Sequence, residues 1–199
     1  NPGDGGRGEN LSYVADARDH VPSSFEFQVS SFILSSMPKV SVIVPNYNHA
    51  RFLTRRLDSV LGQTFQDFEF IVLDDHSTDD SMNVIMEYYS SLPIQQQKKM
   101  RVVRNDKNIG LPASCNKVLS MARGTFIVRV DSDDRLLPSF LDRTIEQSRM
   151  DATQAVLTGY NQTDEQFKTL EVVHKNMWHP ACALLSRWVV NEIKYRDGV

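Results

Sequence analysis

Cysteine is scarce in this sequence. Of its 199 residues only Cys115 and Cys182 are cysteines, and neither lies in a CxxC pair or in a Cys/His spacing typical of a zinc site. A disulfide framework is therefore unsupported, and we expect a reducing compartment, the cytoplasm. Long apolar runs are also missing, because the longest, 31–34 and 40–44, fall far short of the roughly 20 apolar residues of a membrane-spanning helix. The sequence predicts no transmembrane segment.

An excess of positive charge is absent as well. The chain has 22 Lys and Arg against 25 Asp and Glu, which gives a formal net charge of -3. No general basic field would draw the chain to nucleic acid or to an anionic membrane, so we expect no nucleic-acid partner. With 41% hydrophobic and 24% charged residues, the composition is that of an ordinary globular domain.

The first 36 residues differ from the rest. Residues 1–10 are Gly-rich with little to bury, and the strand-like stretch 25–34 has no partner that the sequence identifies. We interpret 1–36 as an N-terminal extension, partly flexible, and 37–199 as the folded domain.

From residue 37 onward, β-branched apolar runs alternate with amphipathic stretches. The predicted strands are 40–44, 68–73, 101–104, 125–130, 155–158 and 169–173. Helices are expected after the first four strands, the third beginning at Pro112 and the fourth at Pro138, with a further short helix at 186–193. This alternation predicts an α/β fold with a mostly parallel sheet, right-handed crossovers and helices on its faces.

Two local details of the helices can also be predicted. In the first helix, Arg51, Arg55, Arg56 and Asp58 lie opposite the apolar stripe and should face solvent. Before the second helix, the polar run 77–80 is expected to supply helix-capping oxygens, with Ser77 or Thr78 as the cap itself.

Open parallel sheets bind ligands at the carboxyl ends of their strands, so the loops that follow the strands are informative. Asp131, Asp133 and Asp134 follow the fourth strand, and such an acidic cluster suits Mg²⁺ or Mn²⁺ holding a diphosphate. The alternative is an acidic turn that caps the next helix. Asp74 and Asp75 follow the second strand and could accept hydrogen bonds from a base or a ribose, or belong to a capping turn.

Four segments in order, 39–48, 57–79, 108–116 and 122–134, resemble successive motifs of the family 2 glycosyltransferases with the Rossmann-like GT-A fold. The resemblance implies an inverting transferase that takes a sugar from a nucleotide-diphosphate sugar, usually a UDP-sugar. The acceptor would be a saccharide or a lipid-linked molecule, in polysaccharide or glycoconjugate biosynthesis. It also allows a peripheral membrane association of a longer protein.

The resemblance assigns roles residue by residue. Pro45 and Tyr47 would line the nucleoside pocket, with Tyr47 stacked on the base, although an aromatic beside a core strand is also typical of packing. The other implied contacts are Asp75 with Asp74 to uracil, Asn108 near the nucleotide, Asp131 and Asp133 to ribose and metal, and Asp134 sharing the metal, Mn²⁺ or Mg²⁺. Cys115 stands where many family members carry Arg.

The family's general base is expected beyond Val199, where the sequence ends, and Asp197 is the candidate within it. On this interpretation the chain is a truncated transferase that binds donor but transfers sugar poorly. A nucleotide-sugar-binding module without its own base is the alternative. A nucleotidyltransferase is disfavoured, because no Gly-rich basic phosphate loop follows the first strand.

Overall fold

The computed structural model describes residues 37–131, 134–150, 155–156, 158, 160–163, 169–173 and 183–186, all of which belong to the unit Met37–Val199. The predicted strand at 25–34, the metal candidate Asp133 and the base candidate Asp197 lie outside these residues.

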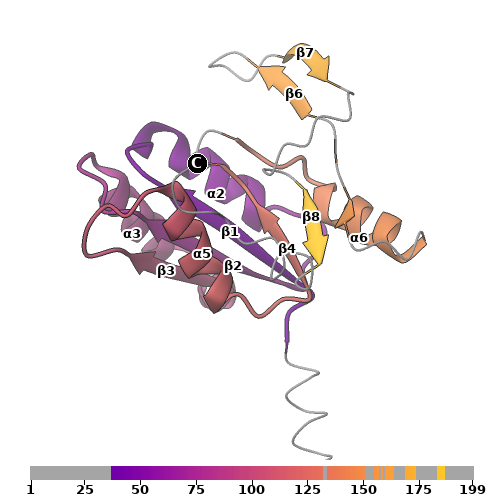
Figure 1. Ribbon diagram of the computed structural model, residues 1–199, viewed down its shortest axis with the longest axis horizontal. Coiled ribbons are helices and arrows are strands. Elements are labelled where there is room, and N and C mark those ends of the chain that lie inside the picture. Colours follow the sequence, from indigo (N-terminus) through magenta and orange to yellow (C-terminus); the bar gives the residue numbers. More distant parts are fainter. Residues whose placement is uncertain are drawn as a thin grey trace, which may run out of the picture. The chain divides into compact units, whose positions relative to one another are not determined.

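The elements follow one another in the predicted alternation (Figure 1). They are β1 (Val40–Asn46), α2 (Ala50–Leu61), β2 (Phe68–Asp74), α3 (Ser81–Ser91), α4 (Ile94–Gln97), β3 (Met100–Arg104), α5 (Leu111–Met121), β4 (Phe126–Arg129), α6 (Phe140–Met150), β5 (Ala155–Val156), β6 (Tyr160–Thr163), β7 (Thr169–Val173) and β8 (Leu184–Ser186).

Among the described residues the main sheet has the strand order β3-β2-β1-β4-β8-β5. Its first four strands are parallel, as predicted, with β1 paired to β2 from Val40 opposite Phe68 to Asn46 opposite Asp74. β8 then runs antiparallel to both β4 and β5, so the sheet is mixed. β6 and β7 form a separate antiparallel pair.

The short helix predicted from residue 186 is wrong at its start. Ser186 ends β8 and pairs with Phe126 of β4, while residues 187–193 lie outside the described part of the chain. β8 has only three residues, and a run of that length carries no periodicity from which a strand can be recognised.

Apolar side chains cover both faces of the sheet, as expected for parallel strands buried between helices. Val40, Val42 and Val44 of β1 belong to one apolar cluster, which includes residues of α2, α3 and α6. Ile43 points to the other face and packs with Val118 of α5 in a second cluster. The period-two alternation of a strand thus explains why the whole run from Val40 to Val44 is apolar.

Arg56 on α2 contradicts the prediction of an exposed polar face. Its side chain is 1% exposed, whereas Arg51, Arg55 and Asp58 are exposed as expected. α2 packs against α3 as well as against the sheet, so its buried arc is wider than the apolar stripe suggests. Arg56 precedes Leu57 by one position, which places it within that wider arc.

None of the helices in the described residues is both long enough and apolar enough to cross a membrane.

Candidate functional site

The strand order reverses beside β1, and this reversal defines the position of the candidate site. The chain builds β1, β2 and β3 in one direction across the sheet and then returns to place β4 on the other side of β1. In open α/β sheets the crevice at such a switch point, outside the carboxyl ends of the strands, is the usual ligand site. The loops after β1, β2 and β4 meet at this edge of the sheet.

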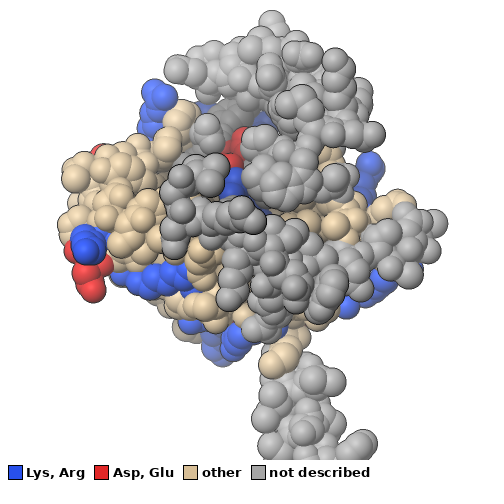
Figure 2. All heavy atoms as spheres, in the orientation of Figure 1, with Lys and Arg blue, Asp and Glu red and all other residues tan. Residues whose placement is uncertain are grey.

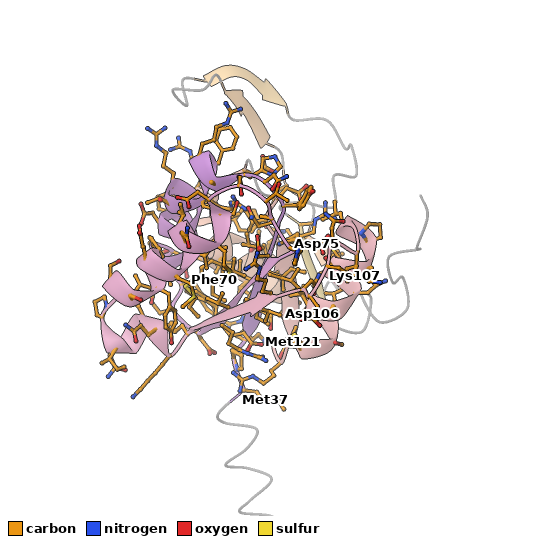
Figure 3. All side chains as sticks on the ribbon, turned by 90° about the vertical axis from the view of Figure 1, so that its left-hand side faces the viewer. Met37, Phe70, Asp75, Asp106, Lys107 and Met121 are labelled. Atoms are coloured by element: carbon orange, nitrogen blue, oxygen red, sulfur yellow. The ribbon has the colours of Figure 1, made fainter. Side chains whose placement is uncertain are left out.

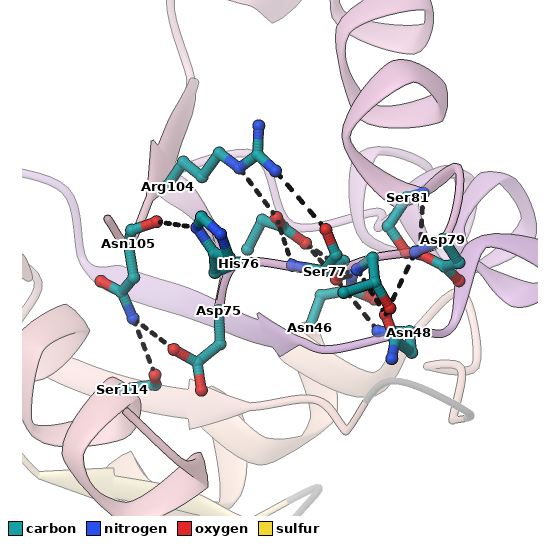
Figure 4. A network of polar contacts seen from close by, with 12 residues as sticks. Asn46, Asn48, Asp75, His76, Ser77, Asp79, Ser81, Arg104, Asn105 and Ser114 are labelled. Atoms are coloured by element: carbon teal, nitrogen blue, oxygen red, sulfur yellow. Dashed lines mark hydrogen bonds and ion pairs between the residues drawn. The ribbon is translucent and has the colours of Figure 1, made fainter. Parts of the chain in front are cut away.

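Reciprocal hydrogen bonds interlock the loops after β1 and β2 (Figure 4). Asn48 Oδ1 accepts the backbone N–H of Thr78 at 2.8 Å, and Asp79 Oδ2 accepts that of Ala50 at 3.0 Å. Asn48 has φ 55°, a left-handed conformation that Asn tolerates better than most residues. The interlock holds the backbone around Tyr47 against the β2 loop.

The run 77–80 does supply the capping oxygen of α3, as predicted, but Ser77 and Thr78 were the wrong choice within it. The N-cap residue of α3 is Asp80, and the first helical N–H, that of Ser81, is bound by Asp79 Oδ1 at 2.9 Å. The hydroxyls of Ser77 and Thr78 instead bond to Asp74 and Asn48. Ser77 and Thr78 therefore bind the ends of β1 and β2, and Asp79 binds the first N–H of the helix.

Asp74 is completely buried at the end of β2 and bonds to protein groups. Its carboxylate accepts from Asn46 Nδ2 at 3.1 Å, from the Ser77 N–H at 3.1 Å and from the Ser77 hydroxyl at 2.5 Å. Arg104 forms an ion pair with it, with Nε 3.5 Å from Asp74 Oδ2. Buried carboxylates are stable when they are paired in this way. In this structure Asp74 joins the ends of β1, β2 and β3, and its predicted contact with uracil stays a prediction.

Asn46 occupies the last position of β1, beside the switch point. Its Nδ2 also points to the Ser77 hydroxyl at 3.3 Å, so the amide is oriented toward β2. Its Oδ1 is buried and has no hydrogen-bond partner among the described residues. An unsatisfied buried acceptor costs free energy unless a water or a ligand group reaches it.

Asp75, the next residue, organises the loop that follows β3. Its Oδ1 accepts from Asn105 Nδ2 at 2.7 Å and from the Ile109 N–H at 2.9 Å, and its Oδ2 accepts from the Gly110 N–H at 2.8 Å. Gly110 has φ +83°, which favours glycine at this turn. Asp75 is 4% exposed, and within the described part of the chain its Oδ2 has one donor, so a lone pair remains for a further donor.

Asn105 is a residue of this network that the sequence analysis missed. Besides Asp75 it bonds to Ser114 of α5 at 3.0 Å, and its Oδ1 accepts from Lys117 at 2.7 Å. It follows β3 directly, so the rule that singled out the other strand ends would also have identified it.

The carboxyl end of β4 carries a paired carboxylate. Arg129 contacts Asp131 at two points, with Nε 2.8 Å from Oδ1 and Nη2 donating to Oδ2 at 2.9 Å. Only the Nη2 contact has hydrogen-bond geometry, so the pair is an ion pair with one charge-assisted hydrogen bond. The turn is closed by the Asp134 N–H, which donates to the Asp131 carbonyl at 3.1 Å. A charged residue inside an apolar strand was the signal in the sequence for Arg129.

Cys115 lies fully buried on α5. Burial raises the pKa of its thiol to about 11, although the nearby Arg129 guanidinium opposes that rise. The position where many family members carry Arg therefore holds a neutral, inert thiol in this chain.

The remaining predicted nucleotide contacts differ in exposure. Tyr47 is 42% exposed and Asn108 is exposed, whereas Pro45 is buried within β1. Figure 3 shows Asp75 at the same side of the domain as Asp106 and Lys107, with Met37 at the opposite end of the strands. Tyr47 is thus available for stacking, while Pro45 belongs to the sheet.

Carboxylate and basic groups both occur near the candidate edge. In Figure 2, red and blue atoms lie near the centre of the visible face, while most other blue side chains lie around its rim. Asp131 and Asp134 supply the oxygen donors that Mg²⁺ and Mn²⁺ prefer. Within the described ranges no group of three or more His, Cys, Asp or Glu could hold an ion, and the predicted metal site stays a prediction.

The fold and the strand-end site define an α/β protein of the GT-A type. The model of the family "Glycosyl transferase family 2" matches residues 41–193, so the chain belongs to this family.

Curated relatives of the chain include synthases and a putative glycosyltransferase. The chain is 32% identical to the chondroitin synthase of Escherichia coli over 128 residues, which cover 64% of this chain and 18% of that protein. It is 31% identical to the hyaluronan synthase of Pasteurella multocida over 140 residues, covering 69% of this chain and 14% of that protein. It is 35% identical to the putative glycosyltransferase EpsE of Bacillus subtilis over 112 residues, covering 56% of this chain and 39% of that protein. The chain thus spans well under half the length of each relative.

Solved structures share the fold. The structure of S. aureus TarS in complex with UDP-GlcNAc matches with a TM-score of 0.64 and 24% identity, covering 78% of this chain and 48% of that one. The mannosyltransferase PcManGT from Pyrobaculum calidifontis, in complex with GDP-Man and Mn²⁺, matches with a TM-score of 0.64 and 20% identity, covering 80% and 47%.

Proposed function

We propose that this chain binds a UDP-sugar at the carboxyl ends of β1, β2 and β4 and belongs to an inverting glycosyltransferase of polysaccharide or glycoconjugate biosynthesis. The acceptor is a saccharide or a lipid-linked molecule. One observation carries the proposal: exposed Tyr47 lies in the loop after β1, the strand at which the sheet order reverses, and Asp75 and Asp131 lie just after the ends of the flanking strands β2 and β4. Family membership supports a transfer reaction.

The two carboxylates have different tasks in this proposal. Asp75 accepts a hydrogen bond from the uracil ring through the lone pair that the Gly110 N–H leaves open, and Tyr47 stacks on the base. Asp131 contacts the ribose. Because Asp75 also fixes the backbone of Ile109 and Gly110, the position of Asn108 beside the nucleotide depends on it.

A divalent ion, Mn²⁺ or Mg²⁺, is part of the proposal, held by Asp131, Asp133 and Asp134. When bound, it would neutralise the diphosphate and stabilise the negative charge that develops on the departing nucleotide. In the structure the Asp131 carboxylate is already neutralised by Arg129. An ion that takes an oxygen of Asp131 must therefore compete with this guanidinium.

Calorimetric titration of the chain with UDP, CDP and GDP, each with Mn²⁺ and with excess chelator, tests the proposal. We expect UDP with Mn²⁺ to bind most tightly, since uracil N3–H can donate to Asp75 and cytosine N3 cannot. A preference for GDP would mean that the sugar donor is a GDP-sugar rather than a UDP-sugar. Equal affinities for all three nucleotides would mean that Asp75 does not recognise the base. No binding of any of them would contradict the proposed function.

A further inference from the structure

The residues that follow the acidic turn are attached to the end of α2. The Leu136 N–H donates to the Ser59 hydroxyl at 3.2 Å, and the Thr64 N–H donates to the Pro138 carbonyl at 2.9 Å. Thr64 also bonds through its hydroxyl to Asp142 at the start of α6. These contacts join positions more than 70 residues apart in the sequence.

Gln63 is the central residue of this attachment. Its Nε2 donates to the Leu137 carbonyl at 2.8 Å and to the Ser59 carbonyl at 2.9 Å, and its Oε1 accepts the Leu141 N–H at 3.0 Å. The side chain is buried, at 2% exposure. The site requires an amide, because it needs two donated hydrogens on one atom and an acceptor on the other.

The opposite end of the acidic turn is also fixed. The Val130 N–H donates to the Ile43 carbonyl at 2.9 Å, which continues the pairing of β4 with β1. Arg129 holds the Asp131 carboxylate from within β4. Asp131 is thus held by the sheet, and the segment that follows Asp134 is held by the end of α2.

A simpler explanation is that Gln63 only satisfies the first N–H groups of α6. That role accounts for its bond to Leu141 but not for the others. Leu136, Leu137 and Pro138 precede α6, and each bonds to Ser59, Gln63 or Thr64. The contacts therefore fix the segment between Asp134 and the helix.

We propose that Gln63 is a positioning residue for the acidic turn, which it holds in place for the divalent ion through the backbone of Leu136–Leu141. This inference rests on the proposed function. Groups that orient metal ligands from outside typically change metal affinity about 10- to 100-fold when they are altered. Gln63 touches neither nucleotide nor ion in this proposal, so its effect should be confined to the part of binding that needs the ion.

The first test needs no ligand. Gln63→Glu keeps the shape and the acceptor for Leu141 but places an oxygen against the carbonyls of Leu137 and Ser59. In hydrogen exchange of the full chain, we expect the amides of Asp134 and Leu136 to exchange about tenfold faster, because their segment opens more often. The amides of Ile109 and Gly110, which Asp75 holds, should keep their rates.

Glu69→Gln is the matched control. Glu69 is also buried, and it accepts hydrogen bonds from Ser41 and Arg123 at the amino ends of the strands. Glu69→Gln replaces a buried carboxylate by an amide, so it should lower the melting temperature and speed hydrogen exchange of the Arg123 amide. The exchange rates of the Asp134 and Leu136 amides should stay within twofold of those in the unmodified chain. Ser59→Ala, a milder change, should speed Leu136 in the same direction as Gln63→Glu.

The second test measures UDP affinity by calorimetry. Gln63→Glu should weaken UDP binding about tenfold with Mn²⁺ and less than twofold with chelator, whereas Glu69→Gln should change neither. Unchanged exchange at Asp134 and Leu136 in Gln63→Glu, or an equal loss of UDP affinity with and without Mn²⁺, would overturn the inference. If the unmodified chain binds no nucleotide, the proposed function fails, and hydrogen exchange still decides whether Gln63 holds the turn.

Discussion

Two adjacent carboxylates illustrate how position within a strand decides the role of a residue. Asp74 is the last residue of β2 and points into the junction with β1 and β3, where Asn46, Ser77 and Arg104 bind it. Asp75 points the other way and holds the Ile109–Gly110 backbone. Because successive side chains of a strand alternate in direction, one member of such a pair supports the fold and the other faces the loops.

Asp75→Ala should weaken UDP binding by roughly 1 to 3 kcal/mol, the usual cost of losing a hydrogen bond to a charged group. The preference for UDP over CDP should disappear with it. Titration of both nucleotides measures the effect, and Asp106→Ala, an exposed carboxylate of the neighbouring loop, is the control for charge. If Asp75→Ala kept both affinity and preference, its role would be limited to holding the loop.

Cys115 should resist alkylation in the folded chain. Because burial raises the pKa of its thiol to about 11 from 9.0, the thiolate fraction at pH 8 falls roughly 100-fold, and the fully buried side chain is also shielded from reagent. Iodoacetamide labelling followed by peptide mass spectrometry separates Cys115 from Cys182. Labelling of Cys115 should rise steeply in denaturant. Equal rates in native and denatured protein would show that Cys115 is accessible.

At the scale of elements, the junction between α5 and β4 depends on close backbone contact. A Cβ added at Gly124 would lie 2.4 Å from the Ser41 nitrogen and 2.6 Å from the Val40 carbonyl carbon, both backbone atoms of β1. The Gly124 N–H also donates to the Ser41 hydroxyl at 2.8 Å. Only glycine therefore fits at position 124, just before β4.

Gly124→Ala should lower the free energy of unfolding by at least about 1 to 3 kcal/mol, the usual cost of overpacking, because β1 and β4 would have to separate. Chemical denaturation followed by circular dichroism measures it. Thr125, the adjacent exposed residue, provides the control. The free energy of unfolding of Thr125→Ala should stay within about 0.5 kcal/mol of that of the unmodified chain. Similar stabilities of the two variants would mean that the junction yields without cost.

The sequence predicted elements that carry a periodic signal and failed where tertiary contacts decide. β1 and β2 were predicted because short, mostly apolar runs mark them, and the continuous run 40–44 is typical of a strand buried on both faces. β8 was missed because a three-residue strand has no such run, and the burial of Arg56 depends on how α2 packs. Strand-end carboxylates were predicted as a group, but the division of roles between Asp74 and Asp75 required knowledge of their hydrogen-bond partners.

For the whole molecule, the candidate site joins parts of the sheet that are distant in sequence. β1 and β2 contribute the interlocked loops, β3 the Asn105 loop and β4 the acidic turn. A ligand that spans the switch point must contact loops on both sides of β1. Its binding energy should therefore stabilise the parallel part of the sheet as a unit.

UDP with Mn²⁺ should raise the melting temperature of the chain. At a ligand concentration of about 100 times the dissociation constant, mass action adds about 2.7 kcal/mol to the free energy of unfolding. For a domain of this size that corresponds to a shift of about 5 to 10 °C, which differential scanning fluorimetry detects.

The shift should be lost in excess chelator, because clustered carboxylates and a diphosphate repel one another without a cation between them. Uridine is the control for the base: it lacks the diphosphate, so any shift that it causes should be the same with Mn²⁺ and with chelator. Asp134→Asn should reduce the Mn²⁺-dependent part of the UDP shift and leave the uridine response unchanged. An equal UDP shift with Mn²⁺ and with chelator would remove the ion from the proposed site and leave Arg129, already paired with Asp131, as the first cation to examine for contact with the diphosphate.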